Sequence, residues 1–141
     1  MNQPQVGTCS HLLVFSARTD AFDRINEFFE MASGGSPEVR EKLKGYEDMM
    51  NAAFTGKPRE QVMLWAQNQA HIALGFAMAA CAELKIDSCP MGGFTPSEVK
   101  EKLELDAIFT PTVLLPIGFR AEEPTRPKIR FGVESIVTIH S

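Results

Sequence analysis

Few cysteines and few positive charges limit what this chain of 141 residues can be. Its three cysteines, Cys9, Cys81 and Cys89, form no CxxC pair and leave an odd thiol, which argues against a disulfide-stapled secreted scaffold and against a zinc site. Lys and Arg number 14 against 18 Asp and Glu, so a formal charge of −4 lacks the broad positive footprint of a nucleic-acid-binding protein. Any anion must therefore be bound by a local cluster of cations.

Long apolar runs are also missing. The sequence contains no run of about eighteen uninterrupted apolar residues, and its first residues show no basic region leading into an apolar one. We therefore expect no membrane span, no signal peptide and a cytoplasmic location. With 44% hydrophobic and 23% charged residues, residues 1–141 fit one domain that buries roughly two thirds of its unfolded surface.

The usual catalytic signatures are absent as well. There is no GxSxG, no GxGxxG after a strand and no Walker lysine motif. His11, His71 and His140 are too far apart to indicate a metal site, and His71 in an apolar segment is more typical of a satisfied core or interface histidine than of a ligand. Cys89 lacks a basic neighbour that would activate it, so small core packing is favoured over a nucleophile for the cysteines.

Hydrophobic periodicity predicts a strand and then two amphipathic helices. His11–Ala17 is a short apolar run typical of a buried strand. Apolar residues from Asp20 to Met31 recur on one helical face, and a Gly-Gly pair follows. Ser36 can cap a second helix, half exposed, that ends at Gly56-Lys57-Pro58.

A third helix, from Pro58 to about Leu84, is predicted to be covered on most sides. Between Ala70 and Ala82 its only polar side chain is His71. Small side chains recur at spacings of three and four, so that another helix backbone could approach this face: Ala66, Ala70, Ala73, Ala77 and Cys81. Because little else in the sequence can cover this helix, a second protomer or a further segment is expected to do so.

The second half of the chain contains strand candidates. Ile86–Met91 and Thr112–Phe119 have strand composition, and Pro116 favours a sheet edge or a bend. Ser135–His140 alternates like an edge strand or a strand exchanged with another chain.

A short helix is predicted at Pro96–Leu105, opened by a capping box of Thr95 and Glu98. Helices and strands alternate along the chain without a βαβ repeat of constant length. The sequence therefore predicts an α+β domain in which a helical layer covers a small mixed sheet.

One loop has the composition of a ligand-binding turn. Cys89–Phe94 follows a predicted strand and precedes a capped helix, a place where exposed backbone N–H groups can face a flat ligand. The alternative is an ordinary strand-to-helix turn with Gly92 or Gly93 at positive φ.

A basic cluster lies near the end of the sequence. Four cations fall within eleven residues: Arg120, Arg126, Lys128 and Arg130. They could bind a phosphate group. The alternative is a solvated face, since Glu122 and Glu123 dilute the positive charge.

Five segments in order carry a resemblance to a known family: Cys9–Phe15, Trp65 with Gln69, Asp87–Phe94 (DSCPMGGF), Leu114–Arg120 (LLPIGFR) and Arg126–Phe131 (RPKIRF). Together they resemble the nitroreductase family of flavin-dependent oxidoreductases over most of the chain. The resemblance implies an α+β sandwich that forms an intertwined homodimer. It also implies that the long helix lies in the dimer core and that FMN lies at the subunit interface.

The resemblance further implies which residues hold the cofactor. The flavin ring would lie against Pro90, Met91, Gly92 and Gly93, with a backbone N–H near position 92 directed at the flavin N5, and the phosphate end would contact Lys128 and Arg130. The family commonly has Glu where this chain has Gly92. The implied reaction is ping-pong: NAD(P)H reduces the flavin, and a nitroaromatic, quinone or similar small-molecule acceptor takes the electrons. No catalytic side chain is implied.

The resemblance covers the C-terminal two thirds of a nitroreductase, so we expect an N-terminally truncated domain. The family's Arg-x-Ser-x-Arg phosphate cluster and Asn-x-Gln-Pro-Trp stretch have no counterpart; Asn2–Gln5 is similar to the latter but lies too close to the strand at His11. Each charge-assisted hydrogen bond to phosphate contributes ~1.5–3 kcal/mol. FMN affinity is therefore expected to fall by orders of magnitude unless another chain supplies these groups.

Three functions remain open at this point. The first is an FMN-dependent NAD(P)H oxidoreductase acting as a homodimer. The second is a non-catalytic remnant or interaction protein that dimerises through the Ala-rich helix and lacks a complete flavin site. The third is a small-molecule-binding module that keeps the loop at 90–93 without redox turnover.

Overall fold

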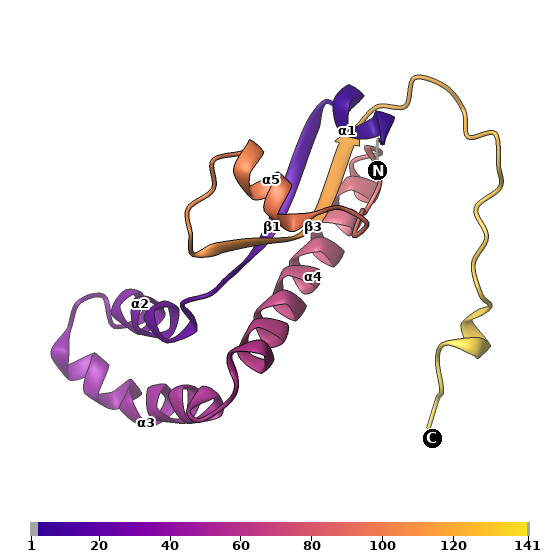
Figure 1. Cartoon of the computed structure of the whole chain (residues 1–141). Helices are drawn as coiled ribbons and strands as arrows, with labels where there is room; N and C mark the ends of the chain where they lie inside the picture. The colour runs from indigo at the N-terminus through magenta and orange to yellow at the C-terminus, as the bar shows by residue number, and fades with distance from the viewer. Residues whose placement is uncertain (1–2, 141) are drawn as a thin grey trace.

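The computed structural model describes residues 3–140 and shows an α+β fold in which a long helix packs against a small sheet (Figure 1). Its helices are α1 (Pro4–Thr8), α2 (Ala21–Ser33), α3 (Pro37–Phe54), α4 (Arg59–Glu83) and α5 (Pro96–Lys102). Its strands are β1 (His11–Arg18), β2 (Asp87–Ser88) and β3 (Phe109–Gly118), and a 3-10 turn, η1, covers Val133–Ser135. The predicted α+β class is confirmed. Asn2 of the Asn2–Gln5 segment lies outside the described residues.

The sheet is antiparallel, with strand order β1-β3-β2. β1 and β3 pair along their whole length, from His11 opposite Ile117 to Arg18 opposite Phe109. β1 and β2 run in the same direction, but β3 lies between them, so within residues 3–140 no two neighbouring strands are parallel. The expected mixed sheet is thereby corrected to an antiparallel one.

β2 is much shorter than the strand predicted over Ile86–Met91. Only Asp87 and Ser88 form a regular ladder with β3, and Met91 rejoins the sheet through an isolated bridge to Leu114. Cys89, between these two pairings, lies opposite Pro116, which has no N–H to donate to the Cys89 oxygen, and this accounts for the interruption. The sheet edge therefore continues past β2 as a loop.

Pro116 lies in the central strand, whereas a proline in a strand predicts a sheet edge or a bend. It pairs with Leu12 of β1, and its carbonyl oxygen accepts a hydrogen bond from the Cys89 N–H at 3.1 Å. In an extended strand the N–H and C=O of one residue point to the same side, so the missing N–H of Pro116 faces the short β2 side. The ladder between β1 and β3 loses no bond.

This chain covers α4 on one face only, and the cover that the sequence predicts for the other sides, from a second protomer or a further segment, stays a prediction. Its buried residues Ala70, Leu74 and Cys81 face the sheet, where Leu74 packs with Val113 and Leu115 of β3. Part of the small-residue stripe thus brings α4 close to its own sheet. On the outer face, Ile72 and Phe76 are 54% and 75% exposed.

α2 and α3 form a second apolar cluster around Ile25, Phe29 and Phe54. The predicted cap of α3 is confirmed, because the Ser36 hydroxyl accepts a hydrogen bond from the Val39 N–H at 3.4 Å. Both helices are exposed on their outer faces, as the sequence predicts for α3.

α5 differs from its prediction at both ends. Thr95 is its N-cap residue but makes no side-chain cap hydrogen bond, so the capping box with Glu98 is not formed. The helix ends at Lys102 and not at Leu105, because Glu104 adopts a positive φ of 51° that a helix cannot accommodate.

The last described residues, 119–140, are here called the tail. All of them are exposed, and Figure 1 shows the tail leaving the end of β3 and running away from the sheet. The strand expected at Ser135–His140 is not formed, because no strand edge of the described chain lies beside it to complete a ladder. No helix in residues 3–140 is long and apolar enough to span a membrane.

Candidate functional site

The loop of residues 89–94 is fixed to the edge of the sheet by backbone hydrogen bonds. The Met91 N–H donates to the Leu114 oxygen at 2.8 Å, and the Leu114 N–H donates to the Met91 oxygen at 3.0 Å. The Cys89 N–H adds a bond to Pro116, at 3.1 Å. The backbone before Gly92 is thereby held in place, and the two glycines project beyond the last strand pairing.

Gly92 and Gly93 are exposed and present unused donors. Within residues 3–140 neither backbone N–H has a hydrogen-bond acceptor, and a Cβ built on Gly92 would meet no atom within 4 Å. Neither residue has a positive φ, so the alternative interpretation, a turn with Gly92 or Gly93 in the left-handed region, is wrong. Backbone conformation does not require glycine here, and the absence of side chains leaves the loop open to close approach by a flat ligand.

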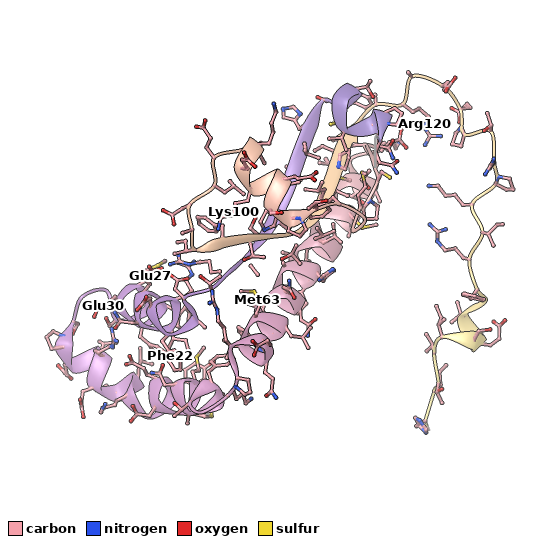
Figure 2. All side chains as sticks on the ribbon, viewed as in Figure 1. Phe22, Glu27, Glu30, Met63, Lys100 and Arg120 are labelled. Carbon is pink, nitrogen blue, oxygen red and sulfur yellow. The ribbon has the colours of Figure 1, made fainter. Side chains whose placement is uncertain are left out.

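Asp87 and Arg120 form an ion pair where the tail begins, and Figure 2 labels Arg120 at this point. The Arg120 Nε and Nη2 atoms lie 2.8 and 2.5 Å from the two Asp87 oxygens. Hydrogen bonds from the Arg120 side chain hold the pKa of Asp87 below its ordinary value, and the charge of Lys128 adds to this effect. Sequence reasoning missed Asp87, because its partner becomes adjacent only through the pairing of β2 with β3.

The four cations of the basic cluster divide into one structural group and three groups open to a ligand. Arg120 is occupied by Asp87 and Glu123. Arg126 and Lys128 make no hydrogen bond or ion pair with the described residues, and Arg130 donates only to the neighbouring Ile129 oxygen, at 2.7 Å. Within a single copy of the chain these cations lie on a solvent-exposed surface, as the alternative interpretation predicts. The same exposure leaves Lys128 and Arg130 free to bind an anion.

The two halves of the predicted site are not brought together within one chain. The loop with Pro90, Met91, Gly92 and Gly93 lies against the sheet, whereas Lys128 and Arg130 lie on the tail, which Figure 1 shows standing apart from α5 and the sheet. Past Arg120, residues 121–140 form no hydrogen bond with the rest of the described chain except that of Glu123 to Arg120.

The remaining candidate residues have other environments. Cys81 is buried as predicted, but Cys89 is exposed, which corrects the prediction of core packing for this residue; it follows the end of β2 at Ser88, and the Gln5 amide lies 3.8 Å from its sulfur. His71 is exposed, and its Nδ1 lies 2.9 Å from the Gln67 oxygen, so it is satisfied within α4 and outside the core of this chain. The described residues contain no cluster of three or more metal-ligating side chains.

A groove of about 510 Å³ between β1, α2 and α4 was not indicated by the sequence. Its lining is mostly apolar and includes Phe28, Met31 and the single tryptophan, Trp65. A second groove, of about 530 Å³, lies at the end of the sheet and is lined by Cys89, Asp87 and Arg120 among others. The second groove adjoins the loop of residues 89–94.

Comparison with protein families and curated proteins gives a consistent match. Residues 17–119 match the model of the nitroreductase family. A candidate NAD(P)H nitroreductase of Staphylococcus haemolyticus is 32% identical over 145 aligned residues, which include 96% of this chain and 66% of that protein. The chain thus spans slightly less than two thirds of the length of this relative.

Solved structures share the fold. A candidate nitroreductase of Bacillus subtilis superposes with a TM-score of 0.83 at 21% identity, covering 98% of this chain and 67% of that one. A candidate nitroreductase of Exiguobacterium sibiricum, in complex with FMN, gives a TM-score of 0.77 at 19% identity, covering 99% of this chain and 67% of that one.

Proposed function

The chain belongs to the nitroreductase family, and from this premise we propose that it is a subunit of an FMN-dependent oxidoreductase that uses NAD(P)H. The observation that carries the proposal is the family match over residues 17–119. The name of the Staphylococcus haemolyticus relative and the FMN in the Exiguobacterium sibiricum structure support the choice of cofactor and co-substrate. Because the chain covers 66% of that relative, the relative's activity is carried over as a proposal.

The loop at 90–93 is chemically suited to the edge of a flavin ring. The free N–H groups of Gly92 and Gly93 are donors, and the flavin edge offers nitrogen and oxygen acceptors. A donor near position 92 that faces N5 would favour negative charge on the ring. We assign the ring to Pro90, Met91, Gly92 and Gly93.

The tail is chemically suited to the phosphate of FMN. Lys128 has no carboxylate partner among the described residues, and the guanidinium of Arg130 donates only to one backbone oxygen. Charge-assisted hydrogen bonds from such groups are the strong contacts of phosphate sites. We assign Lys128 and Arg130 to the phosphate.

A homodimer would bring these two halves together. The exposed outer face of α4, with Ile72 and Phe76, is an apolar surface of the kind that subunits cover. The tail carries further exposed apolar side chains, among them Phe131, Ile136 and Ile139, that this chain leaves without cover. We propose that two copies pack through α4 and that the tail of each reaches the loop of the other.

When bound, FMN would accept hydride from NAD(P)H and then reduce a nitroaromatic, quinone or similar small-molecule acceptor in a ping-pong sequence. The contribution of this chain is to hold the ring edge on backbone donors and the phosphate on two cations. No side chain is assigned a proton transfer. A cytoplasmic location belongs to the same proposal, supported by three free thiols among the described residues.

A second candidate function is an interaction protein of the same family without turnover. It is favoured by one observation, namely that the tail, which carries Lys128 and Arg130, runs away from the sheet within a single chain (Figure 1). Flavin binding without NAD(P)H oxidation would instead indicate a binding module that has kept the loop.

Steady-state oxidation of NADH and NADPH by the purified, FMN-loaded chain tests the proposed function. We expect oxidation that depends on both FMN and a quinone or nitroaromatic acceptor and that falls in the Gly92→Leu variant. The Gly45→Leu variant, at an exposed and unobstructed helix position, is the matched control and should retain the wild-type rate. Wild-type rates no higher than those of free FMN would overturn the enzymatic proposal.

A further inference from the structure

One ion pair lies between the loop at 90–93 and the tail of the same chain. Asp87 precedes Pro90 by three residues, and Arg120 precedes Lys128 by eight. Within the described chain, the only side-chain bonds from the start of the tail back to the sheet are those between Arg120 and Asp87. Whatever fixes this pair therefore fixes the direction in which the tail departs.

The geometry of the pair follows from strand register. Asp87 lies directly opposite Gly118 in the antiparallel pairing of β2 with β3, so Arg120, two residues further along, is the diagonal neighbour on the same face. Oδ2 of Asp87 accepts from the Arg120 Nε at 2.8 Å and from the Arg120 backbone N–H at 3.2 Å, and Oδ1 accepts from Nη2 at 2.5 Å. One carboxylate thus restrains both the side chain and the backbone of Arg120.

The ion pair between Asp87 and Arg120 orients the start of the tail and contributes little to the stability of the fold. Its side chains are 42% and 40% exposed, and exposed ion pairs add little to the free energy of folding. The bidentate contact with an additional backbone donor is the geometry that gives orientational specificity. Glu123 binds the remaining Nη1 at 2.8 Å, so the guanidinium is held from the sheet on one side and from the tail on the other.

We propose that Asp87 is a positioning residue that sets the course of the tail through Arg120, and thereby the placement of Lys128 and Arg130 against the flavin phosphate. This inference rests on the proposed function for its ligand, but the restraint on the tail does not depend on a ligand. Asp87 itself contacts no ligand in this scheme. It acts from the strand end that leads into the loop at 90–93, so in the proposed dimer it connects the ring half of one site to the phosphate half of the other.

The restraint on the tail is tested first without flavin. Hydrogen exchange of the Arg120 amide is compared between the wild type and the Asp87→Asn variant, with Glu123→Gln as the control that alters the same guanidinium from the tail side. We expect faster exchange at Arg120 in Asp87→Asn and wild-type exchange in Glu123→Gln, with the same thermal midpoint in all three. Unchanged exchange in Asp87→Asn overturns the proposal.

The effect on the site is tested by FMN titration of the same variants. We expect Asp87→Asn to raise the Kd for FMN by about fivefold, the upper range for an exposed pair. The decisive variant combines Asp87→Asn with Lys128→Gln and Arg130→Gln: if Asp87 acts by placing these two cations, the triple variant binds no more weakly than Lys128→Gln/Arg130→Gln alone. A further loss in the triple variant, equal to that in the wild-type background, overturns the positioning role. If the wild type binds no FMN, the proposed function fails, and the exchange of the Arg120 amide alone decides whether Asp87 restrains the tail.

Discussion

Met91 and Leu114 exchange both of their backbone hydrogen bonds, with N···O distances of 2.8 and 3.0 Å. This bridge makes the loop before α5 a continuation of the sheet edge, although the regular ladder is interrupted opposite Pro116. Gly92 and Gly93 follow directly, with free N–H groups and no positive φ. In the proposed site, the loop is therefore held by backbone hydrogen bonds to β3, whereas the tail is held to the sheet through Arg120.

A side chain at position 92 should leave the stability of the fold nearly unchanged but should weaken the binding of FMN. Since a Cβ there meets no atom within 4 Å, we expect Gly92→Leu to shift the thermal midpoint by no more than about 2 °C. The Kd for FMN should rise by at least about tenfold, because the side chain occupies the surface on which the ring would lie. Gly45→Leu, equally unobstructed but on α3, should leave FMN binding unchanged; equal affinities for all three proteins would remove the loop from the site.

Lys128 should discriminate between flavins with and without a phosphate. We expect Lys128→Gln to weaken FMN binding by about tenfold or more, since a charge-assisted hydrogen bond is lost. Binding of riboflavin, which has no phosphate, should be the same in the variant and the wild type. Fluorescence titrations with both flavins measure this. Lys57→Gln, which removes an exposed cation between α3 and α4, is the control, and parallel losses for FMN and riboflavin would contradict the assignment.

The outer face of α4 should control self-association. We expect Phe76→Glu to reduce the mass in solution from twice 15.6 kDa to 15.6 kDa, because a carboxylate would be buried in an apolar contact. Met49→Glu introduces the same charge at an exposed position of α3 and should leave the mass unchanged. Light scattering at several concentrations makes the comparison. A wild-type mass of one chain throughout would exclude the proposed dimer.

Stability should fall in acid through the Arg18 network. Arg18 lies at the end of β1 and contacts Asp20 at 2.6 Å and Glu27 at 3.1 Å; Figure 2 labels Glu27 on α2. The Arg18 guanidinium lowers the pKa of Asp20, and Arg24 together with Arg18 lowers the pKa of Glu27. A carboxyl whose pKa is lowered by folding stabilises the fold above its ordinary pKa and loses that contribution as pH falls.

We therefore expect the free energy of unfolding to decline below about pH 4, where these carboxyls take up protons in the unfolded chain while they are still charged in the folded one. Asp20→Asn should be less stable than the wild type at pH 7 and should approach it in acid. Urea titrations at several pH values measure both effects. A constant difference between the two proteins from pH 7 to about pH 3 would show that the Asp20 carboxylate contributes nothing through its charge.

Local patterns predicted most of the helices and both long strands. The apolar run at β1, the periodicity of α2 and α3, and the Ser36 cap depend on neighbours within a few residues, and the structure confirms them. The prediction that Pro116 lies at a sheet edge was wrong. A central strand can contain a proline when its missing N–H faces a short neighbouring strand, and this depends on the strand order. Sequence periodicity carries no strand order.

The candidate site was predictable in its residue types and not in its assembly. The Cys89–Phe94 loop and the basic cluster were visible as segments, but Asp87 gained its role only from its register against Gly118. The sequence also predicted cover for α4 from a second protomer or a further segment, and an edge or exchanged strand at residues 135–140. The described chain alone supplies neither, so the cover and the exchanged strand stay predictions.

The proposed cofactor is tested by titration of the purified chain with FMN, followed by flavin absorbance and fluorescence before and after addition of NADH or NADPH. We expect saturable binding, with one FMN per chain, and loss of the oxidised flavin absorbance when NAD(P)H is added. Flavin that stays free at every protein concentration would contradict it, and the loop at 90–93 and the cations of the tail would then have no cofactor to hold.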